Sequence, residues 1–203
     1  MSIAAEKAQP HRPTAHSLDE CRRCNLWRNA THGVPGAGPD TAKIIIVGEQ
    51  PGDQEDLAGS PFVGPAGKVL DQALMQAGIA RDEVYVTNAV KHFKWELRGK
   101  RRLHKTPAQR EIEACHYWLQ GELNDSRARV IVALGATALK SVLEVKTVAL
   151  GKTLGEVLEH EGRQVVATYH PSYVLRLREA EEKAQAVKLI VATLKKARAL
   201  ADS

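Results

Sequence analysis

Four short apolar runs set the fold class of this chain. They cover residues 44–47, 84–90, 130–134 and 165–168, and they lack the alternation of apolar and polar residues that marks a half-exposed strand. Strands buried on both faces have this pattern, and parallel sheets of α/β proteins consist of such strands. Stretches with helical spacing separate the runs. The sequence therefore predicts a three-layer α/β/α fold with a central, mostly parallel four-stranded sheet.

Four helices are expected from the spacing of apolar residues. The first starts near Pro65 and ends at Gly78, the third covers residues 136–143 and the last runs from about residue 180 to 200. The second helix is expected to have Thr106 as its N-cap and Pro107 at its first position. We see no repeat and no convincing linker, so we expect a single domain over residues 1–203, with residues 1–13 flexible.

Charge is distributed unevenly. The net charge is +5, and residues 91–105 alone hold seven lysines and arginines against one glutamate. Such a local surplus is typical of a surface that binds the phosphates of an anionic polymer, although a solvated loop is the simpler explanation. No run of 18 apolar residues and no apolar signal-peptide centre is present, so we expect a cytoplasmic protein. Nothing constrains the oligomeric state, and a monomer is the plain expectation.

The cysteines indicate a metal site. Cys21 and Cys24 form a Cys-x2-Cys pair, which in a chain without an export signal favours metal or redox chemistry over a structural disulfide. With His92 and Cys115 they give three thiolates and one imidazole. Zinc accepts such a set, and iron–sulfur clusters take thiolates with an occasional histidine, so spacing leaves both open. Cys115 is also compatible with a simple buried helix residue.

Polar segments follow three of the four expected strands. Residues 48–53 follow the first strand, Asn88 lies near the end of the second, and His170 follows the fourth. Ligands of open α/β sheets bind beyond the carboxyl ends of the strands. We therefore expect Glu49, Asn88, His104 and His170 to approach one crevice. The segment after the first strand matches neither phosphate-binding glycine pattern, and taken alone it reads as a plain turn.

Four motifs in this order resemble those of the uracil-DNA glycosylase superfamily. They are residues 48–52 (Gly-Glu-Gln-Pro-Gly), 61–64 (Pro-Phe-Val-Gly), 87–88 (Thr-Asn) and 170–172 (His-Pro-Ser). Each motif is weak alone, but together they are specific, and the resemblance covers roughly residues 20–180. It implies excision of uracil from DNA during DNA repair, and its iron–sulfur branch implies a 4Fe–4S cluster in preference to zinc. The expected ligands are Cys21, Cys24, His92 and Cys115.

Two departures narrow the resemblance. Ordinary iron–sulfur members have cysteine where this chain has His92, and they lack a basic insert that ends in a residue such as His104. Together with Gln50 beside Glu49, these features resemble the UdgX group, which is known for staying covalently attached to DNA through a loop histidine. DNA contacts are expected from Lys100, Arg101, Arg102 and Arg176.

The resemblance also implies a role for each motif residue. Phe62 would stack on a flipped uracil, and Asn88 would donate to a uracil carbonyl and accept from N3–H. His170 would donate to uracil O2 as negative charge develops on the leaving base. Gln50 is expected to orient uracil or a water, and its division of roles with Glu49 stays open.

His104 is the expected nucleophile. An imidazole held near C1′ competes with water through its effective concentration, and Glu49 is expected to hydrogen-bond its other ring nitrogen. The resulting bond has no second step, so we expect a single turnover and a stable adduct with single- or double-stranded uracil-containing DNA. One alternative is a conventional turnover glycosylase in which His104 only contacts phosphate. Another is a module that binds uracil or damaged DNA without cleavage.

Overall fold

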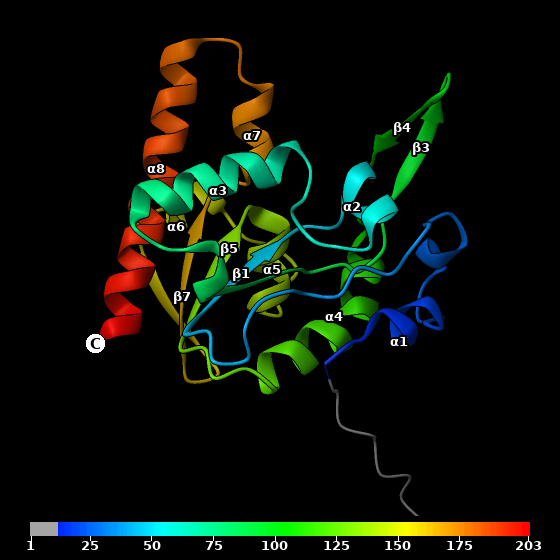
Figure 1. Ribbon diagram of the computed structural model, residues 1–203, viewed down its shortest axis with the longest axis horizontal. Coiled ribbons are helices and arrows are strands. Elements are labelled where there is room, and N and C mark those ends of the chain that lie inside the picture. The colour runs from blue at the N-terminus through cyan, green and yellow to red at the C-terminus, as the bar shows by residue number, and fades with distance from the viewer. Residues whose placement is uncertain (1–11) are drawn as a thin grey trace, which may run out of the picture.

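The computed structural model describes residues 12–203, so the flexibility expected for residues 1–13 lies, except for its last two residues, outside the described residues. Two short 3₁₀ turns accompany the helices and strands shown in Figure 1. In chain order the elements are α1 (Ala15–Asp19), β1 (Ile44–Gly48), α2 (Asp53–Ala58), α3 (Pro65–Ala77), β2 (Val84–Asn88), β3 (Trp95–Arg98), β4 (Arg101–His104), α4 (Gln109–Asn124), β5 (Val130–Leu134), α5 (Ala136–Val142), α6 (Leu150–Thr153), β6 (Val157–His160), β7 (Arg163–Thr168), α7 (Pro171–Arg176) and α8 (Ala180–Asp202).

The central sheet has five strands in the order β2-β1-β5-β7-β6. Strands β2, β1, β5 and β7 are parallel, as the apolar runs predict, and β6 joins β7 in antiparallel orientation. The predicted mostly parallel α/β fold is confirmed, although β2 ends at Asn88 instead of Val90. Strand β6 was missed because it is a half-exposed edge strand without a continuous apolar run.

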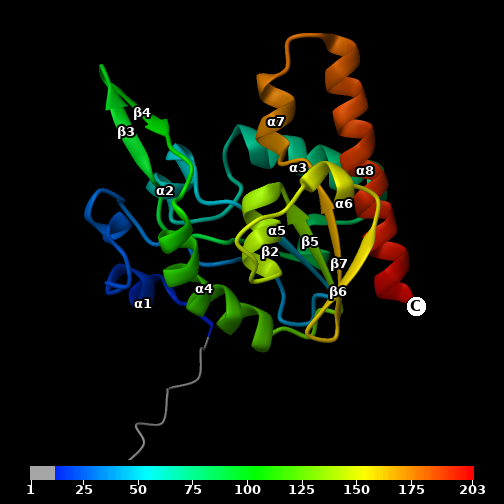
Figure 2. The ribbon, with the colours of Figure 1, turned by 180° about the vertical axis from the view of Figure 1, so that it is seen from behind.

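Helices cover both faces of the sheet and explain why its strands are apolar on both sides. Helices α3, α7 and α8 lie on the face toward the viewer in Figure 1, and α4 and α5 lie on the face seen in Figure 2. Along β1, Ile44 and Ile46 join the core beneath α3 and α8, whereas Ile45 and Val47 pack on the side of α4 and α5. No helix in the described part of the chain is long and apolar enough to span a membrane.

Helices α3, α5 and α8 lie where the spacing predicts them, but the predicted start of α4 is wrong. The helix begins at Gln109, and its N-cap is Ala108 instead of Thr106. The Glu111 carboxylate accepts a hydrogen bond from the Ala108 N–H at 2.6 Å. Because this carboxylate satisfies an amide at the helix start, no hydroxyl cap is needed, and Pro107 lies before the helix.

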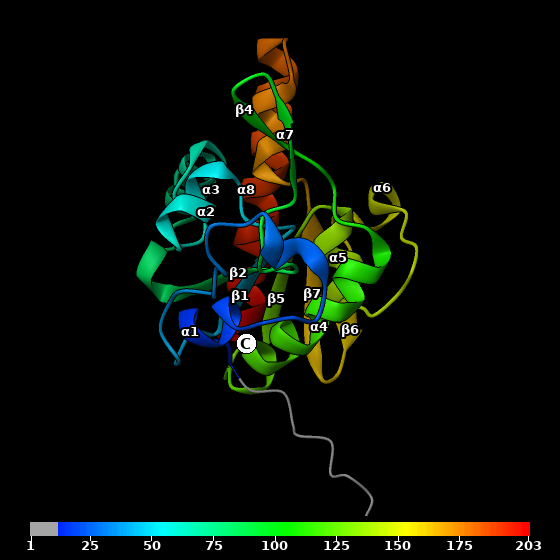
Figure 3. The same cartoon turned by 90° about the vertical axis from the view of Figure 1, so that its right-hand side faces the viewer.

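The basic segment, expected as a loop, is a two-stranded antiparallel ribbon. Strands β3 and β4 pair Trp95 with His104 and Leu97 with Arg102. The strands are joined by Gly99 and Lys100, and Gly99 has a φ of 63°, which glycine adopts without strain. In Figures 1 and 3 this ribbon projects from the body of the protein. His104 is therefore held at the end of a strand and not on an irregular loop.

Candidate active site

A cavity of about 820 Å³ opens at the carboxyl ends of the parallel strands. Glu49 follows β1, Asn88 ends β2 and His170 follows β7, as the strand pattern led us to expect. His104 enters from the other direction, from the end of β4, and all four residues line the cavity. The sheet and the ribbon together thus bring into one place residues that lie far apart in the sequence.

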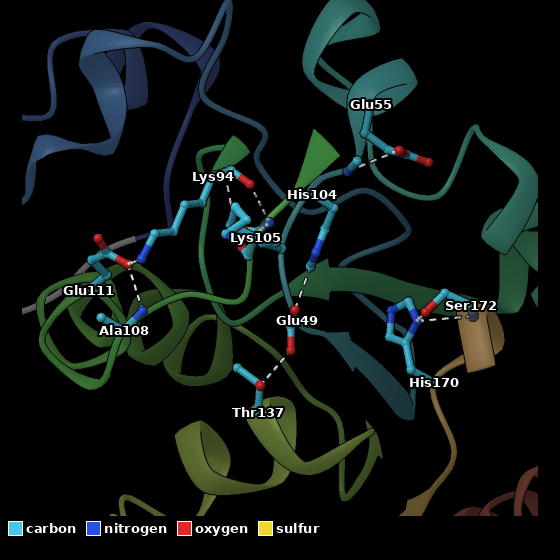
Figure 4. A network of polar contacts seen from close by, with 12 residues as sticks. Glu49, Glu55, Lys94, His104, Lys105, Ala108, Glu111, Thr137, His170 and Ser172 are labelled. Carbon is cyan, nitrogen blue, oxygen red and sulfur yellow. Dashed lines mark hydrogen bonds and ion pairs between the residues drawn. The ribbon is translucent and has the colours of Figure 1, made fainter. Parts of the chain in front are cut away.

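His104, Glu49 and Thr137 form a chain of polar contacts across the cavity (Figure 4). His104 Nε2 lies 3.2 Å from Glu49 Oε1, and the Thr137 hydroxyl donates to Glu49 Oε2 at 2.5 Å. Burial alone would raise the pKa of Glu49, but the hydrogen bonds from His104 and Thr137 outweigh it and leave that pKa below its usual value. Glu49 is thus ionised, and His104 Nδ1 has no hydrogen-bond partner among the described residues.

Thr137 was not predicted as a site residue. It lies in the first turn of α5, directly beyond β5, and it is 6% exposed. Thr137 could have been predicted from its position beyond the carboxyl end of β5, because the other three parallel strands are all followed by or end in site residues.

His170 is held as a neutral imidazole with a defined tautomer. It is the N-cap of α7, and its Nδ1 accepts the Ser172 backbone N–H at 3.1 Å and contacts the Ser172 hydroxyl at 2.8 Å (Figure 4). Burial lowers the pKa of His170 to about 4, although the charge of Glu49 acts to raise it. Since Nδ1 accepts, the proton resides on Nε2, which can donate to a ligand.

Phe62 and Asn88 meet over Gly48. A Cβ at Gly48 would lie 2.4 Å from Asn88 Oδ1 and 2.6 Å from Phe62 Cζ, so only glycine permits this approach. The Phe62 ring also stacks beside the His170 ring, with centroids 6.1 Å apart and an interplanar angle of 28°. Phe62 has a φ of 56°, an uncommon value for a residue other than glycine. Strain of this kind is often found at binding sites.

Glu55 holds the loop that carries Phe62. Its carboxylate accepts the backbone N–H of Gly64 at 2.7 Å and that of Gly52 at 3.1 Å, so it ties the loop after β1 to the loop before α3. Glu55 was not predicted as a site residue. The available signal was its place three residues after Gly52, the N-cap of α2, where a glutamate commonly bonds back to the cap.

The Gln50 side chain bonds to the base of the ribbon. Its Nε2 donates to the carbonyls of Lys94 and Lys105, both at 3.2 Å, and its Oε1 accepts the Lys94 N–H at 3.1 Å. Lys94 directly precedes β3 and Lys105 directly follows β4, so the amide closes the base of the ribbon. Gln50 also lines the cavity, and its expected role in orienting uracil or a water stays a prediction.

Consecutive arginines of the ribbon lie on opposite faces, because side chains alternate along a strand. Arg102 shares its face with His104 and pairs with Asp53 and Asp56, each at 2.6 Å. This contact fastens the ribbon to α2 and pairs the Arg102 guanidinium within the protein, so the expected contact of Arg102 with DNA stays a prediction. Arg101 lies on the other face and is exposed.

The other cations expected to bind DNA are exposed on two sides of the cavity. Lys100 lies at the tip of the ribbon, beside Arg101. Arg176 lies at the end of α7, lines the cavity and donates to the Ser172 hydroxyl at 3.0 Å. A phosphate backbone that crosses the cavity could therefore be contacted from both sides.

The three cysteines gather in a small apolar cluster separate from the sheet. Cys21 accepts the Trp118 ring N–H at 3.2 Å, and Cys115 accepts the Lys91 backbone N–H at 3.2 Å. Burial raises the pKa of the Cys115 thiol to about 12 and also raises that of Cys24. A metal would therefore displace protons when it binds to these thiols.

His92 is 4% exposed and forms a hydrogen bond with the Leu18 backbone. Burial lowers its pKa, so the ring is neutral and its second nitrogen is available to a metal. Ligand atoms around a single zinc ion lie within about 4 Å of one another. Among the described residues, only Glu144, His160 and Glu161 form a group of three possible ligands within 4.8 Å. No three of the four predicted ligands Cys21, Cys24, His92 and Cys115 therefore lie within 4.8 Å of one another in this structure.

Comparisons with known proteins agree with this geometry. Residues 35–195 match the family described as the uracil DNA glycosylase superfamily. A type-4 uracil-DNA glycosylase of Thermotoga maritima is 39% identical over 165 residues, which is 81% of this chain and 82% of that protein. One from Archaeoglobus fulgidus is 38% identical over 172 residues, covering 80% and 83%. A type-5 uracil-DNA glycosylase of Pyrobaculum aerophilum is 33% identical over 171 residues, covering 74% and 70%.

Proposed function

The chain belongs to the uracil-DNA glycosylase superfamily, and we propose that it excises uracil from DNA during base excision repair. The cavity supports this activity, because it offers an aromatic ring and an amide to a base flipped out of the stack. Phe62 supplies the ring. The Asn88 side chain has no hydrogen-bond partner among the described residues, so its oxygen and nitrogen are available to N3–H and a carbonyl of uracil.

Bond breaking in this proposal is assisted by His170. The bond between C1′ and uracil N1 breaks, its electron pair leaves with the base, and the sugar becomes an oxocarbenium-like cation. The Nε2–H of His170 donates to uracil O2, where negative charge builds. Because the ring is neutral and its Nδ1 is fixed by Ser172, this donor is in place before the reaction starts.

We further propose that His104 captures the sugar. The observation that carries this step is the 3.2 Å contact between His104 and Glu49 at the edge of the cavity. The ring nitrogen that does not face Glu49 uses its lone pair to form a bond with C1′. The resulting imidazolium is stabilised by the Glu49 carboxylate, and the uracil anion takes a proton from water. The product is an N-glycoside with no group to expel it, so the enzyme turns over once.

For the metal site we propose a 4Fe–4S cluster held by Cys21, Cys24, Cys115 and His92. The type-4 relatives support this choice, and no three of the four ligands lie within 4.8 Å of one another, which argues against a single zinc ion. The cluster would supply cross-links and no chemistry at the base. Its residues would tie the segment before β1 to α4 and to the chain that leads from β2 into the ribbon.

A conventional turnover glycosylase is the second candidate. It is favoured by the relatives, which are named as uracil-DNA glycosylases. In that case His104, whose side chain is 47% exposed, would contact a DNA phosphate, and water would attack the sugar.

Denaturing gel electrophoresis with a labelled uracil-containing oligonucleotide separates these candidates. If His104 captures the sugar, a band shifted by the mass of the protein appears with uracil and not with a thymine control. An alkali-labile abasic site without a shifted band would establish a turnover glycosylase and remove the nucleophilic role of His104. If neither product forms while the oligonucleotide still binds, the chain is a binding module.

A further inference from the structure

Lys91 and Glu122 form an ion pair that is completely shielded from water. Both side chains are 0% exposed, and Lys91 Nζ lies 2.6 Å from Glu122 Oε2. The same ammonium donates to the Thr87 hydroxyl at 2.6 Å and to the Asn88 carbonyl at 2.8 Å. Its three hydrogen-bond donors therefore have three partners, and two of these partners belong to the end of β2.

This ammonium completes the hydrogen bonding at the outer edge of the sheet. Strand β2 lies at the edge, and Val86 exchanges two backbone hydrogen bonds with Ala37, which flanks it on the outer side. Two residues further along, the Asn88 carbonyl is bonded to the Lys91 side chain instead of to a neighbouring strand. The second oxygen of Glu122 accepts the Gly36 N–H at 2.8 Å, so the carboxylate joins α4 to both segments.

Stability alone does not explain such a pair. Two buried charges lose their hydration, and apolar residues of similar size often replace a buried pair without loss of stability. The pair is bonded to a residue of the site, because Lys91 holds the backbone carbonyl of Asn88, and the side-chain amide of Asn88 lines the cavity. The chain next to it is also anchored, since the Lys91 N–H donates to Cys115, which lies two helical turns before Glu122 on α4.

We propose that Lys91 and Glu122 are positioning residues for Asn88. By holding the Asn88 carbonyl, they fix the direction in which its side-chain amide enters the cavity, and so the hydrogen bonds that select uracil. The inference rests on the proposed uracil excision. It adds that the rate of excision depends on a buried ion pair outside the cavity.

The variant Lys91→Met/Glu122→Met tests the proposal, because it removes both charges and leaves neither unpaired. We expect the purified protein to fold and to keep its iron content, with a lower melting temperature because the Asn88 carbonyl and the Gly36 N–H lose their partners. Rates are therefore compared per folded, iron-loaded protein. Its single-turnover rate of uracil release at saturating concentration should fall at least about tenfold, since small displacements of a catalytic contact have effects of this size. The concentration that gives half of this rate should change little, because the exposed cations of the ribbon and α7 remain.

An Asn88→Ala background shows whether the pair acts through Asn88. If it does, adding the double substitution to Asn88→Ala should lower the excision rate by less than about threefold, since the contact is already lost. If the double substitution lowers the excision rate of Asn88→Ala by the same factor as it lowers the rate of the unaltered protein, the proposal is overturned. It is also overturned by a double variant that excises uracil at the unaltered rate, or by one whose loss of rate matches its loss of folded, iron-loaded protein.

Arg81→Gln/Asp71→Asn is the matched control, because it removes an ion pair on α3 and the turn before β2, away from the cavity. Its excision rate should equal that of the unaltered protein. If the unaltered protein released no uracil, the proposed function itself would fail. The positioning role alone would fail if the unaltered protein released uracil and the Lys91→Met/Glu122→Met variant released it equally fast.

Discussion

The pKa values of Glu49 and His170 are both lowered, for opposite physical reasons. Glu49 is stabilised in its charged form by His104 and Thr137, which together outweigh its burial. His170 is driven to its neutral form by burial, which outweighs the attraction of Glu49. Near pH 7 Glu49 is thus a carboxylate and His170 is a neutral imidazole donor. This combination suits a reaction in which a sugar becomes positive and a base becomes negative.

His104→Ser separates excision from capture. The serine hydroxyl is a weaker nucleophile than an imidazole and cannot reach as far, so we expect uracil release to continue while the SDS-stable band disappears. Mass spectrometry of the DNA should then show a free abasic site. His116→Ser, on the far side of α4, serves as the control and should still form the adduct. An adduct of undiminished yield in the His104 variant would show that another residue captures the sugar.

The depressed pKa of His170 predicts how stability changes with pH. The unfolded chain binds a proton at about pH 6.5, whereas the folded chain binds it only at about pH 4. The free energy of unfolding should therefore decrease as the pH falls from about 6.5 towards 4, because the unfolded state binds more protons in this window.

His170→Asn provides the comparison for that pH dependence. Asparagine also caps helices, so it can replace the bond to the Ser172 N–H, but it does not titrate. Urea unfolding at pH 7 and pH 5 should show a smaller loss of stability for this variant than for the unaltered protein. Equal losses would mean that His170 does not contribute to the acid sensitivity.

At the scale of elements, Arg101 and Arg102 lie on opposite faces of the β3–β4 ribbon, and we expect them to have different roles. Arg101→Gln should reduce the slope of log affinity against log salt by about 0.7–0.9, as expected when one phosphate contact is lost. Arg102→Gln should leave this slope unchanged, because its guanidinium is bonded to Asp53 and Asp56. It also leaves the fully buried Asp56 carboxylate without its ion-pair partner, which should loosen the ribbon.

The looser ribbon should affect capture more than excision. His104 lies at the end of β4, whereas Phe62, Asn88 and His170 are held by the sheet and its loops. In Arg102→Gln we expect adduct formation to slow by about tenfold and uracil release to change less. The Arg101 variant, measured at low salt, is the control for both rates. If its adduct yield fell as far as that of the Arg102 variant, a positioning role for Arg102 would have no support.

The elements that could be predicted are those whose apolar pattern is complete within one short stretch of the sequence. The parallel strands and α3, α5 and α8 have buried runs or helical spacing that tertiary contacts reinforce. Strand β6 and the ribbon are half exposed, so their apolar pattern is weak, although Gly99-Lys100 between two strand-like segments was a usable turn signal. The start of α4 depended on the Glu111 carboxylate, which competed with Thr106 as the source of the cap.

Site residues could be predicted where a strand end determines their place. Glu49, Asn88 and His170 follow parallel strands, so their meeting at the cavity follows from sheet topology. The side-chain contacts of Gln50 and Arg102 could not be predicted in the same way, because both depend on how the ribbon packs against α2 and the loop after β1. That packing involves partners 44 to 55 residues away from Gln50 in sequence.

At the scale of the whole molecule, the ribbon and the α7–α8 pair project from the same end of the protein (Figures 1 and 3). The cavity opens between residues contributed by these two projections, His104 from one and Tyr173 and Arg176 from the other. Two large apolar cores support the sheet, and a third, smaller one contains the cysteines. The two large cores lie on opposite faces of the same strands, whereas the third shares no residue with them and can lose order separately.

Loss of the proposed cluster should therefore loosen only one part of the molecule. The third core packs Leu18 and Leu26 against Ile112 and Trp118, and the proposed cluster would cross-link these segments. After oxidative removal of iron, hydrogen exchange should accelerate in residues 12–34 and 109–118, while β1, β5 and β7 keep their protection. Cys115→Ser should reproduce this pattern, and Ser141→Ala, a buried substitution elsewhere, should not. Uniform loss of protection across the sheet would mean that the cluster supports the whole fold, and unchanged exchange near Leu18 would argue against a structural cluster at this site.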